Sequence, residues 1–206
     1  MNTRIETYLN ERAAEFGLID ENRKESLRQL AGWIREKRDS GSDALLLFIC
    51  THNSRRSHLA QVWGNVCAEF VGLSHVQTFS GGTEATACYK STIAALKRAG
   101  LEISTDQPNE KNPVYKVRFN DDPDQVLECY SKKFTDQPNP QKAFCAVMTC
   151  SSADEACPFV PGAEKRIATP YTDPKVSDGS VKEDETYDER CRQIARELLW
   201  TMREAL

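Results

Sequence analysis

The sequence Ala44-Leu-Leu-Leu-Phe-Ile-Cys50, followed by Thr51-His-Asn-Ser-Arg-Arg-Ser57, joins an apolar run to a polar loop that starts at a cysteine. The apolar run is typical of a buried strand, and residues 57–71 predict a helix. A loop between a strand and a helix can turn successive backbone N–H groups toward an anion, and the helix N-terminus adds the positive end of its dipole. This stretch therefore predicts an anion-binding loop in an α/β fold.

The C-x5-R-S pattern formed by Cys50, Arg56 and Ser57 predicts a cysteine nucleophile beside that anion. Cysteine reacts as the thiolate, and a field of amides, helix dipole and guanidinium favours this form. Arg56 can place two donors on the oxygens of the anion, and Ser57 can donate a hydrogen bond to the sulfur. The bare pattern is weak in a chain with 8 cysteines, so the surrounding strand, loop and helix carry the prediction. The alternative is a buried free cysteine at the end of a strand.

The remaining loop residues supply the expected oxyanion site. We expect the anion to be bound by Thr51, His52, Asn53, Ser54, Arg55 and Arg56. Asn53 and Ser54 can also brace a tight loop through bonds from their side chains to the backbone.

Composition narrows the class of protein. A chain of 206 residues can hold one domain with a sizeable core plus appendages. Its net charge of −4 argues against nucleic-acid and membrane partners. No apolar run has membrane-spanning length and the N-terminus is too polar for a signal peptide, so we expect a cytoplasmic protein with reduced thiols. No cluster of zinc ligands is evident, and we expect neither a metal nor a cofactor. Five other cysteines are expected to be small buried or half-buried side chains without a chemical role: Cys67, Cys88, Cys129, Cys145 and Cys191.

Periodicity predicts alternating helices and strands along the chain. Helices are expected at 2–17, 21–39 (with Asp20 as its cap), 57–71, about 88–99 (ended by Gly100) and about 185–205. Strands are expected at 44–49, 76–80 and 144–149, with a turn at Gly81-Gly82. A hairpin is expected from 114–119 and 126–134 across Asn120-Asp-Asp-Pro123. Alternating strands and helices predict a parallel sheet covered on both sides, with Cys50 and Cys150 at the carboxyl ends of strands, where ligands bind.

Several stretches resemble one protein family. They are Cys50–Gln61, Phe79-Ser-Gly-Gly-Thr-Glu84, Leu101-Glu-Ile-Ser104, Val147-Met-Thr-Cys150 through Cys157-Pro158, Lys165-Arg166 and Tyr171-Thr-Asp-Pro174. The chain resembles the low-molecular-weight protein tyrosine phosphatase superfamily, and more closely its thioredoxin-coupled arsenate reductase branch, over residues 44–206. The resemblance implies a three-layer flavodoxin-like sandwich with a central, mostly parallel four-stranded sheet. It divides the chain into an N-terminal helical extension at 1–42 and a domain at 43–206, with a hairpin inserted at about 113–140.

The resemblance also implies roles for three further residues. Cys150 and Cys157 would relay oxidation away from Cys50, and Asp173, held by Pro174, would protonate a leaving oxygen. On sequence alone, Asp173 could equally be a turn aspartate before a proline. If residues 150–157 were helical, the two cysteine Cα atoms would lie about 10 Å apart, whereas a disulfide needs roughly 7 Å or less. The segment must then unwind when it oxidises.

Two residues depart from the family pattern. His52 stands where glycine is usual, so it either contacts the anion or lies exposed on the rim. Gln61 replaces the acidic residue of the reductases that use potassium, which weakens any potassium site. His58 is interpreted as a solvated helix residue and His75 as a turn residue.

Three functions follow. The first is arsenate reduction through a Cys50–arsenate adduct, a Cys50–Cys150 disulfide, and transfer to Cys150–Cys157 for a thioredoxin-type reductant. The second is hydrolysis of tyrosine phosphate or small phosphoesters through a phosphocysteine. The third is a non-enzymatic module with an inactive loop, which binds a phospho-ligand or a partner and uses the helices of residues 1–40 as a docking element. Residues 1–40 otherwise pack on the domain or form a dimer contact, and the oligomeric state is left open.

Overall fold

A four-stranded parallel sheet forms the centre of the protein. The computed structural model describes residues 1–120, 122 and 125–206, and of residue 156 only the backbone. The sheet has the order β2-β1-β6-β7, built from β2 (Val76–Gly82), β1 (Ala44–Cys50), β6 (Phe144–Met148) and β7 (Ala163–Ala168). Each neighbouring pair is parallel. The predicted parallel sheet is confirmed, and β7 is the strand that periodicity did not indicate.

The central strand β1 is buried on both faces, which explains its unbroken apolar run. Leu46 and Phe48 belong to the larger core, whereas Leu47 and Ile49 belong to a second cluster on the opposite face. Side chains alternate between the two faces of a strand, so a strand covered on both sides needs apolar residues throughout.

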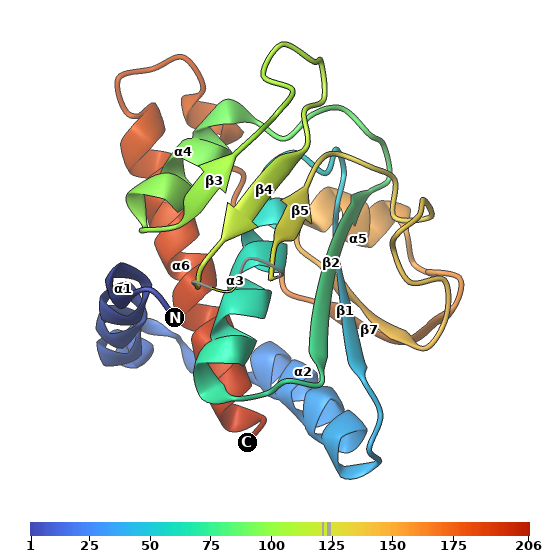
Figure 1. Cartoon of the computed structure of the whole chain (residues 1–206). Coiled ribbons are helices and arrows are strands. Elements are labelled where there is room, and N and C mark those ends of the chain that lie inside the picture. The colour runs from blue at the N-terminus through green and yellow to red at the C-terminus, as the bar shows by residue number, and fades with distance from the viewer. Residues whose placement is uncertain (121, 123–124) are drawn as a thin grey trace.

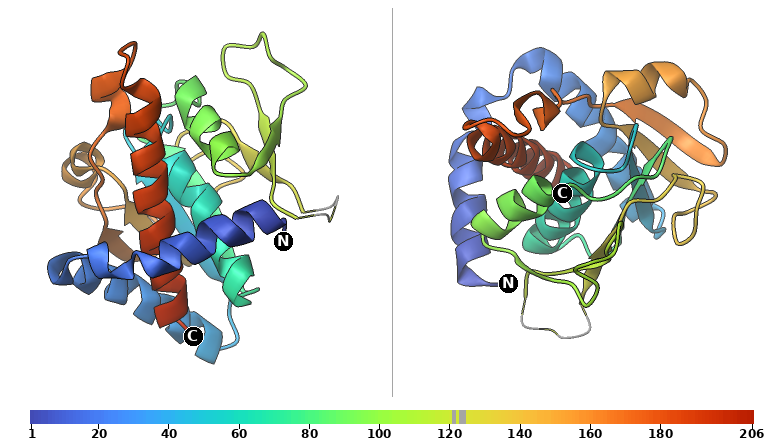
Figure 2. Two further views of the ribbon diagram at one scale, coloured as in Figure 1. Left: turned by 90° about the vertical axis from the view of Figure 1, so that its left-hand side faces the viewer. Right: turned by 90° about the horizontal axis from the view of Figure 1, so that it is seen from above.

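Helices and loops cover the sheet on both sides, giving the predicted three-layer arrangement. Contacts of α3 (Arg56–Val71) and α2 (Glu21–Asp39) with the sheet, and of α3 with α6 (Glu183–Glu204), form the thicker layer. The short helix α5 (Ser151–Ala156) contacts β1 and β6 and contributes Ala153 to the second cluster. Figures 1 and 2 show α6 as the long helix that α1, α2, α3 and α4 (Lys90–Arg98) surround. No helix in the described part of the chain is long and apolar enough to cross a membrane.

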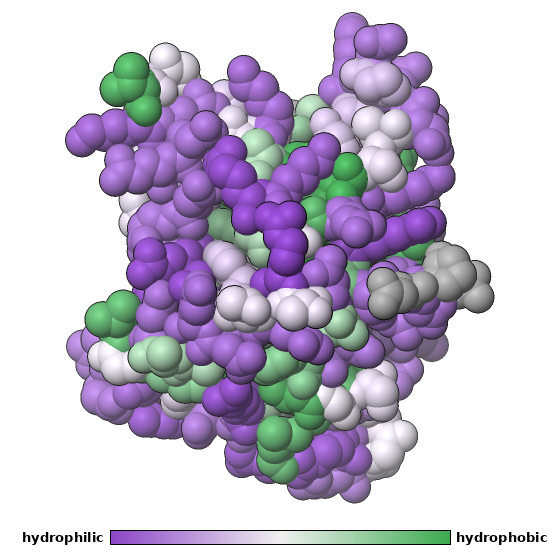
Figure 3. Space-filling view, turned by 60° about the vertical axis from the view of Figure 1, so that its left-hand side comes forward, coloured by the Kyte–Doolittle hydropathy of each residue, from purple (hydrophilic) through white to green (hydrophobic). Residues whose placement is uncertain are grey.

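The two N-terminal helices form as predicted. The first, α1 (Thr3–Ala14), is capped by Asn2, and α2 is capped by the Asp20 side chain, with a short 3-10 turn η1 (Phe16–Leu18) between them. Both pack against α6, and Ile5, Leu9 and Leu30 lie in the main core. The face that Figure 3 shows is mostly hydrophilic. These helices therefore pack on the rest of the chain through their apolar sides, while the division at residue 42 stays a prediction.

The inserted hairpin is present and belongs to a second, small sheet. Its strands β4 (Tyr115–Arg118) and β5 (Leu127–Cys129) are antiparallel, and β3 (Glu102–Ser104) pairs with β4. The predicted turn at Asn120–Pro123 lies partly outside the described residues. The strands are shorter than predicted, because the chain after Cys129 leaves the small sheet to contact the end of β2.

The predicted turn at Gly81-Gly82 was wrong, since both residues belong to β2. A Cβ at Gly81 would lie 2.4 Å from the Cα of Phe134. A Cβ at Gly82 would lie 2.2 Å from the carbonyl oxygen of Glu84 and 2.7 Å from the backbone nitrogen of Asn53. The glycines are needed because other backbones approach the end of β2 closely, and a turn plays no part.

The interpretation of His58 as a solvated residue was also wrong. Its side chain is 0% exposed, because the first two turns of α3 are enclosed between the sheet, α6 and the residues around β5. Burial lowers the pKa of His58 to about 3. Its Nδ1 lies 3.3 Å from the hydroxyl of Ser80. His75 does lie in a turn, and its Nε2 lies 3.3 Å from the carbonyl oxygen of Ile34.

The buried His58 predicts a specific loss of stability in acid. The pKa falls from 6.5 in the unfolded chain to about 3 in the fold, so between these values the unfolded state binds the extra proton. This contribution to the free energy of unfolding is complete above pH 6.5 and falls, as the pH drops toward 3, by about 1.4 kcal/mol per unit. We expect the free energy of unfolding, measured with urea, to fall less between pH 7 and pH 5 in His58→Gln than in the unaltered chain. Equal losses would contradict the assignment.

Candidate active site

The loop after β1 leaves a row of backbone amides free. Among the described residues, the N–H groups of His52, Asn53, Ser54 and Arg55 have no acceptor within the protein. The first amides of α3 add to this row, because a helix N-terminus lacks intrahelical acceptors. A pocket of ≈ 10 Å³ opens here, lined by Cys50, His52, Ser54, Arg55, Arg56 and Asp173. This volume corresponds to about one water molecule, and the free amides favour an anion that reaches into the pocket.

Cys50 lies at the base of this pocket. Its side chain is 4% exposed, and its sulfur lies 3.1 Å from the hydroxyl of Ser57. The Nδ2 of Asn53 donates to the same hydroxyl at 2.8 Å. Because this bond occupies one lone pair of the Ser57 oxygen, the Ser57 proton is free to be donated to the sulfur. The predicted contact between Ser57 and Cys50 is thus present in the structure.

Asn53 fixes the bend of the loop. Its backbone has φ 43°, in the left-handed region that asparagine tolerates better than most residues. Its side chain is fully buried and bonded at both ends, since Oδ1 accepts from the backbone N–H of Lys132 at 2.9 Å. Asparagine therefore links the loop to the cysteine on one side and to the inserted segment on the other.

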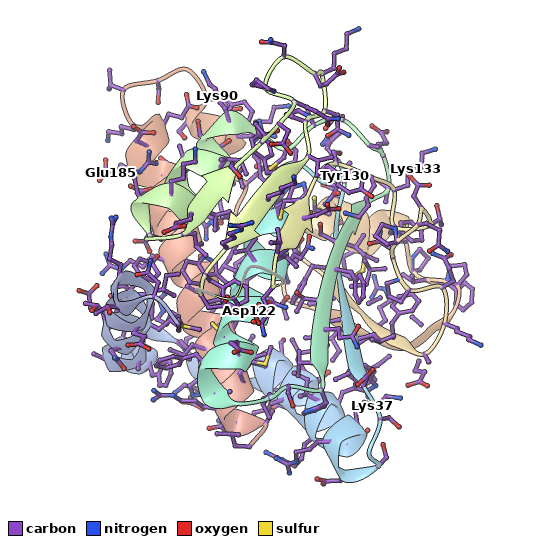
Figure 4. The ribbon with its side chains drawn as sticks, in the orientation of Figure 1. Lys37, Lys90, Asp122, Tyr130, Lys133 and Glu185 are labelled. Atoms are coloured by element: carbon purple, nitrogen blue, oxygen red, sulfur yellow. The ribbon has the colours of Figure 1, made fainter. Side chains whose placement is uncertain are left out.

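The segment after β5 forms the wall behind the loop, which the sequence did not indicate. The hydroxyl of Ser131 donates to the carbonyl of His52 at 2.9 Å and accepts from the N–H of Thr86 at 2.8 Å. The carbonyl of Lys132 accepts from the N–H of Gly82 at 2.9 Å. Figure 4 labels Tyr130 and Lys133, which flank this pair. The insertion thus supports the anion loop, whereas the alternating pattern at 126–134 predicted a strand at Ser131 and Lys132 and gave no sign of this contact.

The two adjacent arginines have different partners. Arg55 donates to the hydroxyl of Tyr187 at 2.5 Å and to Asp178 at 2.6 Å, and its guanidinium lies 4.3 Å above the ring of Tyr89. Burial alone would lower its pKa, but the bonds to Tyr187 and Asp178 raise it. Its side chain is committed to these partners, and its backbone amide is the group left for an oxyanion.

Arg56 joins the predicted anion site to the predicted acid. Its Nη1 donates to the carbonyl of Tyr171 at 2.9 Å and its Nη2 pairs with Asp173 at 2.5 Å. Its Nε is buried without a partner among the described residues. Asp173 also accepts from the N–H of Lys175 at 3.1 Å, which caps the 3-10 turn η2 (Pro174–Ser177). Asp173 is therefore both a carboxylate at the pocket and a turn residue, and its role as an acid stays a prediction.

The second and third thiols lie at opposite ends of α5. Cys150 is buried in the same cluster as Cys50, and its sulfur lies 3.5 Å from the hydroxyl of Thr51. Cys157 is half-buried at the other end of the helix. All eight cysteines are free thiols in this structure, and the five not assigned to the site are buried as expected. Burial raises the pKa of Cys129 and that of Cys191 to about 12.

His52 and Gln61, the two departures from the family pattern, differ in their exposure. His52 is exposed on the rim, with its Nε2 3.7 Å from the carboxylate of Glu84. Gln61 is buried, and its Oε1 accepts from the hydroxyl of Ser80 at 2.6 Å. Within the part of the chain that the structure describes, no group of three His, Cys, Asp or Glu side chains is arranged to hold a metal ion.

Comparison by sequence finds relatives of this chain that are named arsenate reductases. An arsenate reductase from Staphylococcus epidermidis is 30% identical over 129 residues, which are 63% of this chain and 77% of that protein. The chain belongs to the arsenate reductase family. A further member from Halalkalibacterium halodurans is 27% identical over 139 residues, 68% of this chain and 80% of that one. No protein-family model matches the chain.

The fold of this family member is also that of solved phosphatases. A low molecular weight phosphotyrosine phosphatase from Vibrio cholerae superimposes with a TM-score of 0.50 at 14% identity, covering 75% of this chain and 92% of that one. At this identity the likeness concerns the fold alone. The fold predicted from the resemblance, a flavodoxin-like sandwich, is confirmed.

The close approach at Gly82 predicts that its replacement disables the anion loop. In Gly82→Ala the added Cβ would overlap the backbone of Glu84, Thr51 and Asn53 and displace the loop amides. Such overpacking costs about 1–3 kcal/mol. If this cost falls on the loop, inorganic phosphate should bind about 5- to 150-fold more weakly by calorimetry. The control is Gly32→Ala on α2, where a Cβ meets nothing within 4 Å. Unaltered binding by Gly82→Ala would remove the loop from the binding site.

Proposed function

We propose that this protein reduces arsenate through three of its own thiols. The observation that carries the proposal is the position of Cys150. It follows β6, the strand next to β1, so a second thiol lies beside the anion loop and its nucleophile. A hydrolase that uses only a phosphocysteine has no need of this second thiol. Family membership supports the same reaction.

The first step forms a bond between sulfur and arsenic. Arsenate lies on the free amides of residues 52–55 and the Nε side of Arg56, with Cys50 at its base. The Cys50 thiolate attacks the arsenic, and one arsenate oxygen takes up protons and leaves as water. Ser57 holds the sulfur in place through its hydrogen bond. The product is a Cys50–arsenate adduct with arsenic still in its oxidised state.

The second step reduces arsenic and oxidises two thiols. The Cys150 sulfur attacks the sulfur of Cys50, forming an S–S bond while the S–As bond breaks. The electron pair of that bond stays on arsenic, which departs as arsenite. Cys157 then attacks Cys150, so the disulfide moves to Cys150–Cys157 and Cys50 is released as a thiol.

The third thiol connects the buried chemistry to an external reductant. Of the three sulfurs, that of Cys157 belongs to the only residue that is not buried. A dithiol protein of the thioredoxin type, in a reducing cytoplasm, would attack the Cys150–Cys157 disulfide and restore both thiols.

A second candidate is hydrolysis of phosphoesters. It is favoured by one observation, the placement of the Asp173 carboxylate at the same pocket as Cys50, 2.5 Å from the Arg56 guanidinium. Asp173 would protonate the leaving oxygen and then activate water against a phosphocysteine. Phosphate and arsenate share shape and charge, so the two activities can coexist in one pocket.

The relay predicts different losses for its two outer thiols. With arsenate and a thioredoxin system, Cys150→Ser should abolish turnover, and Cys157→Ser should release about one arsenite per protein and stop. If the protein also acts as a phosphatase, hydrolysis of an aryl phosphate should persist in both variants, because Cys50 is the only one of the three thiols that this reaction uses. Continuous cycling by Cys157→Ser would exclude the relay. Rapid hydrolysis without arsenate-dependent thioredoxin oxidation in the unaltered chain would favour the phosphatase.

A further inference from the structure

Helix α5 holds the two outer thiols of the proposed relay apart. It spans Ser151–Ala156, with Cys150 as its N-cap and Cys157 as its C-cap. The sulfur of Cys150 accepts from the N–H of Ala153 at 3.3 Å, and the N–H of Cys157 donates to the carbonyl of Ala153 at 3.0 Å. Seven residues of helical rise separate the cysteine Cα atoms by about 10 Å. A disulfide between them needs roughly 7 Å or less, so the helix must unwind before it can form.

The N-terminal half of α5 is fixed by the core. Cys150 and Ala153 are buried in the second apolar cluster, which also contains Cys50. Ser151, Ser152 and Glu155 are exposed. Unwinding therefore does not require any large apolar side chain of the helix to leave the core.

The C-terminal half is held by one side chain, that of Arg166 on β7. Its Nε donates to the carbonyl of Cys157 at 3.0 Å, and its Nη2 donates to the carbonyl of Asp154 at 2.6 Å and to the Asp154 carboxylate. Carbonyls at a helix C-terminus lack intrahelical donors, and an arginine there satisfies them. Among the described residues, no other side chain donates to the carbonyls of residues 151–157. In Figure 1, α5 and the strand β7 lie on the same side of the molecule.

We infer that Arg166 is a latch that keeps Cys150 and Cys157 apart in the reduced protein and thereby sets the reduction potential of this pair. The inference rests on the proposed relay. Two of the three bonds that Arg166 makes go to the carbonyls of Asp154 and Cys157. These two bonds exist only while the carbonyls keep their helical positions. When the disulfide forms, these carbonyls move and the bonds break, so Arg166 stabilises the dithiol relative to the disulfide.

The latch determines which of the two disulfides, Cys50–Cys150 or Cys150–Cys157, forms first. It takes no part in the transfer of electrons. In the second exchange, the Cys157 thiolate attacks the sulfur of Cys150, and its proton goes to solvent. The Cys150–Cys157 bond forms as the Cys50–Cys150 bond breaks, and Cys50 leaves as a thiolate. Because Arg166 disfavours the closed pair, Cys150 stays a free thiol until Cys50 carries the arsenic adduct.

The test measures the disulfide equilibrium of the outer pair alone. In full-length protein carrying Cys50→Ser, the Cys150–Cys157 disulfide is quantified by alkylation and peptide mass spectrometry in defined mixtures of reduced and oxidised glutathione. We expect Arg166→Gln to raise the equilibrium constant for disulfide formation about tenfold, which makes the potential about 30 mV more negative. Lys165→Gln is the matched control, because Lys165 is the exposed neighbour on the same strand and has no bond to α5.

A second variant guards against a general loss of folding. Asp154→Ala removes the carboxylate partner of Arg166 but keeps both carbonyl contacts, so it should shift the potential in the same direction by less. If the equilibrium constant for disulfide formation in both variants stays within twofold of that in the protein with Arg166 and Asp154 intact, the proposed role of Arg166 is wrong. If no Cys150–Cys157 disulfide forms at any glutathione ratio even with Arg166 intact, the relay itself fails, and the latch fails with it.

Discussion

The left-handed turn at Asn53 is the constraint on which the site depends. At φ 43° the chain reverses so that the amides on either side of it find no carbonyl partner. Unpartnered amides cost free energy in a folded protein unless water or a ligand takes them. The conformation persists because the Asn53 side chain is bonded to Ser57 in the first turn of α3 and to Lys132 in the inserted segment. The bond to Ser57 also leaves the proton of its hydroxyl free for the nucleophile.

The pocket contains a charge pair, in which Asp173 balances the buried charge of Arg56. The guanidinium of Arg56 is mostly buried, and an unpaired charge in such a place is costly. Asp173 and the Tyr171 carbonyl take its two outer nitrogens, and its Nε has no partner among the described residues. These bonds already hold the guanidinium in place beside the anion loop. The carboxylate that balances this guanidinium is the one that the proposed hydrolysis would use to protonate a leaving oxygen.

The sequence predicted what local patterns encode, and it missed what distant segments impose. The strand at 44–49, the helix that begins at Glu21 after its cap Asp20, the start of α3 to within one residue, and the contact between Cys50 and Ser57 follow from periodicity and motif. The strand β7 reads Ala-Glu-Lys-Arg-Ile-Ala, with too few apolar residues to indicate a buried edge. His58, Gly82 and Lys132 were misjudged or overlooked for a shared reason. Each is determined by a segment far away in the chain that packs against it, and helical or strand periodicity carries no record of such a contact.

The three thiols are buried to different degrees, and in the proposed relay this difference sets the direction in which oxidation moves. Cys50 and Cys150 are buried at the ends of adjacent strands, whereas Cys157 is half-buried beyond a six-residue helix. A disulfide between the first two is shielded from any protein-sized reductant, so oxidation has to move outward before it can be removed. A rigid link between buried and exposed sulfurs would prevent that movement, and a loose link would let the outer pair close too early. A helix that buries Ala153 and is held at its far end by polar bonds from β7 satisfies both demands. Its opening cost lies in a few hydrogen bonds, each worth about 1 kcal/mol net.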